Sequence, residues 1–222
     1  MIDYKLVRSR RRTLAICITK SGEAEVRAPL KLSKETIDRF VSSKQEWITQ
    51  KTAIMAERAQ RRKAFLVQEG DTLTLLGREY PVVSGTRAEF DGERFFVPFA
   101  ENKIIKSRLL ALYKQLAKQE IEKRIEYFSQ TMGLQPTSVK IGSANTYWGC
   151  CSAKNGLIFS WKLVMAQPDA IDYVIVHELA HIKEHNHSAR FWELVENVLP
   201  DYKFRREKLK ELQRKLSCED WN

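Results

Sequence analysis

The sequence predicts an α+β protein, with a mostly β half over residues 1–100 and a metal-bearing α+β half over residues 101–222. Three observations predict this class. Short runs of alternating apolar and polar residues, separated by turn residues, occupy much of the first half and are typical of strands. A long run with apolar residues at helical spacing follows. Histidines four residues apart then lie on a further helical pattern.

The N-terminal half is expected to contain two groups of strands with one long helix between them. The first group is residues 4–7, 13–19 and 24–27, with a turn at Ser21 and Gly22. Ser33 is the predicted N-cap of a helix that continues to about residue 64, because apolar residues recur there at helical spacing. The second group is residues 72–76 and 80–83, with Gly77 and Arg78 as a turn and a later hairpin at Asp91 and Gly92.

The C-terminal half is expected to begin with a helix over residues 101–132. Gly133 closes it, in the position that favours a left-handed backbone. Strands are expected at residues 138–142 and 157–161, with a loop at 148–152 between them. A helix that begins near Pro168 and Asp169 follows, since proline and acidic residues are favoured in a first turn. Two basic helices complete the chain.

The pattern His177-Glu178-Leu179-Ala180-His181 carries the chemistry of the chain. Residues four apart lie on one face of a helix, so His177 and His181 can bind the same ion. Glu178 lies about 100° around the helix from His177 at ~3.6 residues per turn, where it can hold a water molecule without binding the metal. The opposite face is apolar and consists of Ile171, Ile175, Leu179 and Ile182. This is the arrangement of zinc peptidases.

A catalytic zinc ion usually has three protein ligands and one open position, so a third ligand is needed. His185 continues the series but lies about 12 Å from His177 along the axis at ~1.5 Å per residue, too far to share an ion bound at ~2.0 Å. If the helix breaks at Asn186, His187 can turn back to the metal, and it is the predicted third ligand. The alternatives are ligands from a following helix, Glu193 and Glu196.

The net charge of +10 is concentrated in basic clusters at residues 8–12, 61–63 and 203–215. Such an excess favours polyanions, so weak association with nucleic acid is one expectation. Solvated helix faces explain the same clusters equally well, and no recognised nucleic-acid motif decides between the two interpretations.

The cysteines and the apolar runs indicate the compartment. Cys17, Cys150, Cys151 and Cys218 lack CxxC spacing and are interpreted as free thiols of a reducing compartment. No apolar run approaches the ~18 residues of a membrane span, and the basic start lacks the apolar segment of a secretory signal. A cytoplasmic location without a membrane partner is therefore expected.

Taken together, these features resemble the YgjP-type metal-dependent hydrolases, which share a compact zincin core with the SprT-like proteases. The matching residues are 8–12, 26–29, 47–48, 148–149, 161–163, 172–174, 177–181, 186–188 and 191–192. The resemblance implies a zincin-like metallopeptidase core, with the HExxH helix packed on a small antiparallel sheet. It also implies one zinc ion per chain, held by His177, His181 and His187, with Glu178 as the base.

The tryptophan loop departs from the family pattern. Tyr147 stands where a basic residue is expected, and Cys150 stands where a serine is expected. Tyr147 and Trp148 are the candidate substrate-binding residues, although a large indole such as Trp148 is first of all a core-packing residue.

The predicted function is zinc-dependent hydrolysis of a protein or peptide, with Glu178 moving the proton. One alternative is a metal-dependent nucleoside triphosphate pyrophosphohydrolase, because arginine clusters also bind phosphates. A second alternative is a basic nucleic-acid-binding module with a structural zinc. The presence of Glu178 argues against it, because a structural site needs no carboxylate beside a water molecule.

Overall fold

The computed structural model describes residues 2–221, and contacts divide them into two compact units. The first consists of the residues up to Phe65 together with Leu216–Asp220, and the second of Leu66–Lys215 together with Trp221. The division differs from the predicted boundary near residue 100. The reason is that the strands before residue 100 pack on the long helix after it: the Tyr113 hydroxyl donates to the Thr74 carbonyl at 2.9 Å, and the rings of Tyr113 and Phe95 lie 5.6 Å apart.

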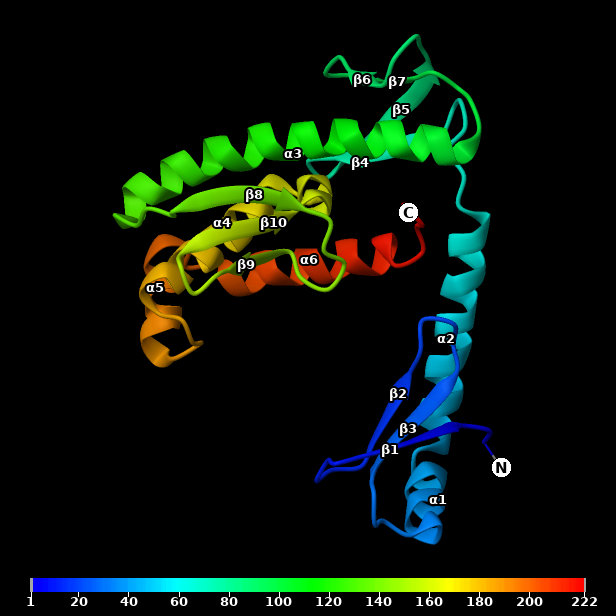
Figure 1. Ribbon diagram of the computed structural model, residues 1–222. Helices are drawn as coiled ribbons and strands as arrows, with labels where there is room; N and C mark the ends of the chain where they lie inside the picture. The colour runs from blue at the N-terminus through cyan, green and yellow to red at the C-terminus, as the bar shows by residue number, and fades with distance from the viewer. Residues whose placement is uncertain (1, 222) are drawn as a thin grey trace. The chain divides into compact units, whose positions relative to one another are not determined.

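The first unit is a three-stranded sheet covered by two helices. Its elements are β1 (Lys5–Ser9), β2 (Ala15–Ile18), β3 (Ala24–Pro29), α1 (Lys34–Ser43) and α2 (Gln45–Ala64) (Figure 1). The strand order is β1-β3-β2, with β1 parallel and β2 antiparallel to β3. The core consists of Ala24, Val26, Ala28, Ile37, Val41 and Ile48.

The helix predicted from Ser33 to about residue 64 is two helices. Ser33 caps the first as predicted, since its Oγ accepts a hydrogen bond from the Thr36 backbone amide at 3.2 Å. The chain then leaves the helical conformation at Lys44, with φ −115° and ψ 13°. The spacing of apolar residues does not reveal this break, because Val41 and Ile48 are two helical turns apart and would share one face of an uninterrupted helix.

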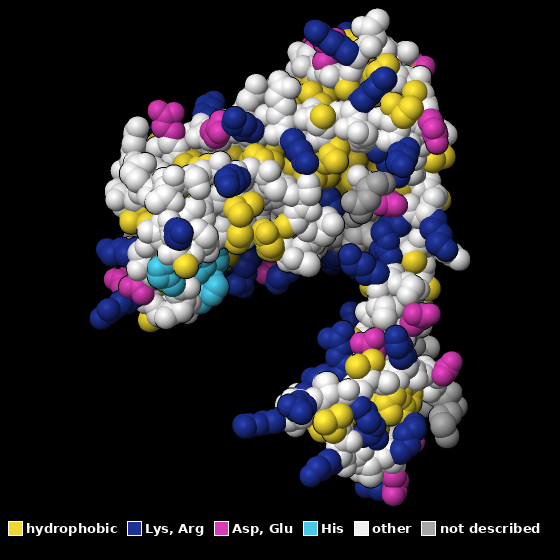
Figure 2. Space-filling model, in the orientation of Figure 1, with side chains coloured by type: hydrophobic (Ala, Val, Ile, Leu, Met, Phe, Trp, Pro, Cys, Tyr) yellow, Lys and Arg dark blue, Asp and Glu magenta, His cyan; other side chains and the backbone are white. Residues whose placement is uncertain are grey.

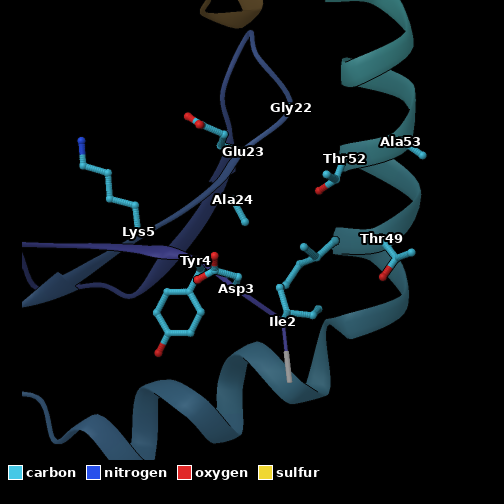
Figure 3. Close-up of a pocket in the computed structure, with 11 residues that line it drawn as sticks. Ile2, Asp3, Tyr4, Lys5, Gly22, Glu23, Ala24, Thr49, Thr52 and Ala53 are labelled. Atoms are coloured by element: carbon cyan, nitrogen blue, oxygen red, sulfur yellow. The ribbon is translucent and has the colours of Figure 1, made fainter.

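A groove of about 740 Å³ lies between this sheet and α2, and Figure 3 shows the side chains that line it. Tyr4 and Lys5 line one side, and Thr49, Thr52 and Ala53 of α2 line the other. None of the histidines borders this groove, so the predicted chemistry belongs to the second unit.

The second unit begins with a four-stranded sheet in the order β4-β5-β7-β6. The strands are β4 (Thr72–Leu75), β5 (Arg78–Ser84), β6 (Glu89–Phe90) and β7 (Phe95–Val97). The first hairpin turns at Leu76 and Gly77, one residue earlier than predicted, and both have positive φ, 50° and 75°. The predicted hairpin at Asp91 and Gly92 is confirmed by the antiparallel pairing of β6 with β7.

Helix α3 (Asn102–Met132) confirms the longest predicted helix, and Gly133 ends it with φ 64°. After it come β8 (Ser138–Gly142), β9 (Gly149–Cys151) and β10 (Gly156–Ser160) in the order β8-β10-β9. β10 is parallel to β8 and antiparallel to β9, so this sheet is mixed rather than purely antiparallel. Residues 149–151 form a strand where a loop was predicted, because they pair with residues 157–159 of β10.

The remaining elements are the 3₁₀ turn η1 (Trp161–Met165) and the helices α4 (Pro168–Lys183), α5 (Ala189–Val198) and α6 (Tyr202–Leu216). α4 packs against α3, β9 and α5. The fold class is α+β, as predicted (Figure 1). Among residues 2–221, no helix combines the length and apolar character needed to cross a membrane.

Candidate metal centre

Helix α4 is held in the fold by one buried face and by ion pairs near its start. Ile171, Ile175 and Leu179 are fully buried on the face predicted to be apolar. Near the N-terminus of α4, Asp172 accepts a hydrogen bond from Arg124 of α3, and Asp169 pairs with Lys208 of α6. α4 is therefore fixed between two other helices, and its histidine face is presented in one orientation.

Three imidazoles meet at the C-terminal end of α4. The Nε2 atoms of His177 and His187 lie 3.1 Å apart, and one ligand atom from each of His177, His181 and His187 lies within 4.8 Å of the others. Tetrahedral zinc with Zn–N bonds of ~2.0 Å separates two ligand nitrogens by about 3.3 Å. The 3.1 Å spacing of the His177 and His187 nitrogens is close to this value, and the third donor, from His181, lies near both. The histidine side chains form one group at the surface (Figure 2).

The turn after α4 brings His187 into this cluster. The helix ends at Lys183, and the chain turns back through residues 184–188 before α5 begins at Ala189. The predicted break therefore comes about one turn of helix earlier than Asn186. Among the described residues, the alternative ligands Glu193 and Glu196 are exposed and lie outside the cluster. His185, which was predicted to lie too far from His177 to share an ion, is also exposed and outside it.

Hydrogen bonds at the far ring nitrogens orient two of the imidazoles. The Nδ1–H of His181 donates to the Glu184 backbone carbonyl at 3.0 Å. Because a carbonyl only accepts, the Nε2 of His181 keeps its lone pair for a metal. The Nδ1 of His177 lies 3.4 Å from the Tyr173 hydroxyl, which leaves the Nε2 of His177 directed toward His187.

Burial keeps two of the histidines in the form that a metal requires. It is the main cause that lowers the pKa of His177 to about 3, with smaller contributions from the charges of His181, His187 and Arg206. Burial also lowers the pKa of His181. Both side chains are therefore neutral at neutral pH, and a metal ion need not displace a proton from them.

An aromatic wall supports the cluster from α5 and α6. The ring of Phe191, which is fully buried, lies 4.4 to 4.8 Å from the rings of the three histidines. Trp192 stacks on His187 at 5.6 Å and on Tyr202 at 5.2 Å. Phe191 and Trp192 are among the residues that carry the family resemblance, but the sequence pattern predicts no role for them. Helical spacing places Phe191 and Val195 on one buried face of α5, but it does not show that the histidines lie against it.

Glu178 lies beside the cluster and is 6% exposed. Burial raises its pKa to about 7. Gly149 of β9 lies directly against it, because a Cβ at this position would be 2.7 Å from Glu178 Cγ and 3.0 Å from its Cδ. The absence of a side chain at Gly149 therefore allows the Glu178 carboxyl group to occupy its position.

Because Glu178 is the predicted base, replacing Gly149 with Ala is expected to displace its carboxyl group and to lower kcat on the order of 10²-fold, the cost of a small displacement of such a group. Zinc content should not change. The matched control is Gly142→Ala in β8, where the added Cβ would meet Ile158 Cγ2 at 3.2 Å, far from the histidines in sequence. Equal activity of both variants would show that Gly149 does not position Glu178.

A cavity of about 260 Å³ opens beside His177 and Glu178. Its other lining residues are Trp148, Gly149, Tyr173, Val174, Arg206, Leu209, Lys210 and Gln213. Trp148, a predicted substrate-binding residue, is thus at the cavity. Tyr147 is not among the lining residues; it is 43% exposed, and a hydrogen bond with the Cys150 thiol raises its pKa.

Three convergent imidazoles, a buried carboxylic acid next to them and a cavity in front of them are the arrangement of a metal-dependent hydrolase. The chain belongs to the YgjP-like family: the model described as YgjP-like, metallopeptidase domain, matches residues 12–212. No curated protein matches the chain. Among solved structures, the metallopeptidase zymogen of Pyrococcus abyssi abylysin matches with 25% identity, over 45% of this chain and 97% of that chain, with a TM-score of 0.39.

Proposed function

We propose that this member of a metallopeptidase family is a zinc-dependent peptidase. His177, His181 and His187 hold one zinc ion, and Glu178 is the general base. One observation carries the proposal: three imidazole donors converge within 4.8 Å of one another, next to a carboxylic acid that is 6% exposed. Burying an acid beside a histidine cluster costs stability, and groups kept at such a cost are typical of functional sites.

A bound zinc ion lowers the pKa of water and polarises a peptide carbonyl. Glu178 supplies the proton transfers. Burial alone raises its pKa to about 7, and a cation close by favours its carboxylate form, so that it can accept a proton from the attacking water. Glu178 then delivers this proton to the leaving amine. Tyr173 and the Glu184 carbonyl hold the far nitrogens of His177 and His181, which fixes the directions of their donor atoms.

The alternative function, a nucleic-acid-binding module with a structural zinc ion, is less favoured. Structural zinc sites use four protein ligands and are closed, whereas the group found here consists of three histidines beside a cavity. A fourth position left open for water and substrate is typical of catalytic zinc.

Hydrolysis of a nucleoside triphosphate is the second candidate function. The observation in its favour is that Arg206 and Lys210 line the same cavity, since such side chains also bind phosphates. The assay described next separates it from peptide hydrolysis.

The test is a hydrolysis assay on the purified chain, treated with a chelator and then reloaded with zinc. Protein substrates with and without DNA, and nucleoside triphosphates, are assayed in parallel. Zinc-dependent release of new amino termini supports the proposal. Zinc-dependent release of pyrophosphate with no proteolysis replaces it with the second candidate, and zinc binding without any hydrolysis favours a structural site.

Nucleic-acid association is a prediction that the structure does not support, because several residues of the basic clusters have partners within the chain. Arg8 donates to the backbone carbonyls of Pro29, Leu30 and Leu32. Arg62 donates to the carbonyls of Lys20 and Ser217. Lys215 pairs with Glu79. Much of the positive charge therefore has a structural use.

The buried acid gives a pH-dependent prediction for the metal-free chain. The pKa of Glu178 is about 7 in the folded chain and 4.5 in the unfolded chain. The contribution of Glu178 to stability is therefore complete below pH 4.5 and is lost as the pH rises through 7. Glu178→Gln has no such loss. The variant should therefore gain stability relative to the native chain by about 3 kcal/mol between pH 4.5 and pH 8.

Urea unfolding of both proteins with chelator, at each pH, measures this difference. His177 has the opposite dependence, because its pKa is lowered, but both proteins contain it and it cancels in the comparison. A stability difference that stays constant with pH would show that Glu178 is not desolvated.

A further inference from the structure

The cavity beside the metal centre has a cationic wall that the proposed mechanism does not use. This wall comes from one face of α6. Arg206, Leu209, Lys210 and Gln213 are spaced i, i+3, i+4 and i+7, and all of them line the cavity. Two cationic side chains, one helical turn apart, therefore lie on the cavity side of α6.

Within the described part of the chain, Arg206 differs from Arg205 and Lys208 of α6 in having no hydrogen-bond or ion-pair partner. Arg205 pairs with Asp172 and Asp201, and Lys208 pairs with Asp169. Within residues 2–221, Arg206 has neither a hydrogen bond nor an ion pair. Lys210 pairs with Glu207 at 2.7 Å, but both side chains are more than half exposed, and such a pair is weak enough to exchange partners.

The position of Arg206 in the cavity leaves Glu178 free to act as a base. Burial lowers the pKa of His177 and raises the pKa of Tyr173; the charge of Arg206 adds a smaller lowering at His177 and opposes the rise at Tyr173. Within residues 2–221, Arg206 forms no ion pair with Glu178, so the guanidinium does not neutralise that carboxyl group. The guanidinium thus remains available for an anionic group that enters from outside.

The walls and size of the cavity indicate which anion fits. Val174 and Leu209, both nearly fully buried, and the indole of Trp148 form its apolar part. Its volume of about 260 Å³ is below the ~300–1,000 Å³ of pockets that enclose a whole small molecule. One residue of a peptide, with a short apolar stem and a carboxylate end, matches both the apolar walls and the cationic end.

We propose that Arg206, assisted by Lys210, binds a carboxylate of the substrate peptide next to the bond that is cleaved. This inference rests on the proposed peptidase function and adds a substrate class to it: peptides with an acidic side chain or a free C-terminal carboxylate at that position. A guanidinium binds a carboxylate through two parallel hydrogen bonds, which positions the group as well as attracting it.

The test uses two pairs of otherwise identical peptide libraries with the zinc-loaded chain. One pair carries Glu or Gln at each position in turn, and the other ends in a carboxylate or an amide. The ratio of kcat/KM within each pair measures the preference for a carboxylate and identifies its source. The native chain should favour the carboxylate form in one of the pairs by about 10- to 100-fold, the effect of one hydrogen bond to a charged group.

Arg206→Gln should bring this ratio close to 1, and Arg206→Lys should restore part of it. Arg214→Gln is the matched control, because Arg214 lies on α6 outside the cavity and its replacement should leave the ratio unchanged. Hydrolysis without a carboxylate preference, or a preference that Arg206→Gln retains, overturns the inference while the peptidase function stands.

A binding measurement separates the two proposals when peptides are not cleaved. The same peptides are titrated into the zinc-loaded Glu178→Gln variant, with nucleoside triphosphates as competitors. Binding that favours the carboxylate form and is lost in the double variant with Arg206→Gln supports the subsite even if the peptidase assay fails. Absence of peptide binding together with Arg206-dependent binding of nucleoside triphosphates overturns both proposals.

Discussion

Glu178→Gln is expected to lower kcat by about 10²–10⁴ while the chain keeps its fold and its zinc ion. Glutamine has the size of glutamate but cannot accept a proton from water. Its neutral amide can occupy the same position against Gly149, because the side-chain atoms there are the same in number. Loss of hydrolysis without loss of metal therefore isolates proton transfer from metal binding.

The measurement compares kcat on the best substrate with zinc content determined on the same sample. Glu193→Gln is the control, since Glu193 is exposed on α5 and lies outside the histidine cluster. Retention of native turnover by Glu178→Gln would remove Glu178 from the mechanism. Loss of zinc in this variant would instead make Glu178 a ligand.

The helix that presents the histidines could be predicted because each of its determinants is local. Pro168 begins it, Ile171 and Ile175 mark its buried face, and the i, i+4 spacing places His177 and His181 together. Helix α3 was predictable for the same reason, since Gly133 alone marks its end. Local chemistry determined these elements, and no distant residue had to be known.

Elements that depend on pairing between distant segments were harder to predict from the sequence. Residues 149–151 have no alternation of apolar and polar side chains, and they form β9 because β10 supplies hydrogen-bonding partners. The same pairing, with β8 on the other side of β10, makes the sheet mixed. A sequence pattern contains no information on which neighbour a short strand will find.

The candidate site divides in the same way. The cluster of His177, His181 and His187 follows from helical spacing and one turn of the chain. By contrast, the contact of Phe191 with all three rings and the position of Arg206 at the cavity depend on how α5 and α6 pack against α4. The sequence assigned the basic residues of α6 to a single charged cluster. The structure separates Arg205 and Lys208, which stabilise the fold, from Arg206, which faces the cavity.

His187→Ala is expected to weaken zinc binding by more than 10–100-fold, the loss typical of residues that only support a ligand. Removing one of three nitrogen donors leaves His177 and His181 as the remaining protein ligands, and two donors do not hold zinc in a catalytic site. His185→Ala should have no such effect, because His185 is exposed and its ring is not part of the cluster. The two variants remove the same kind of side chain two positions apart.

Zinc affinity is measured by competition with a chromophoric chelator, and circular dichroism checks the fold of each variant. The substitutions Glu193→Ala and Glu196→Ala complete the set, since both side chains belong to the helix that follows His187. Similar weakening by His185→Ala and His187→Ala, or weakening by a glutamate substitution alone, would show that the third ligand is misassigned. Weakening by His187→Ala alone would show that His187, and not a glutamate, completes the ligand set. This is the expected result, because the Nε2 of His187 lies 3.1 Å from that of His177, whereas Glu193 and Glu196 are exposed.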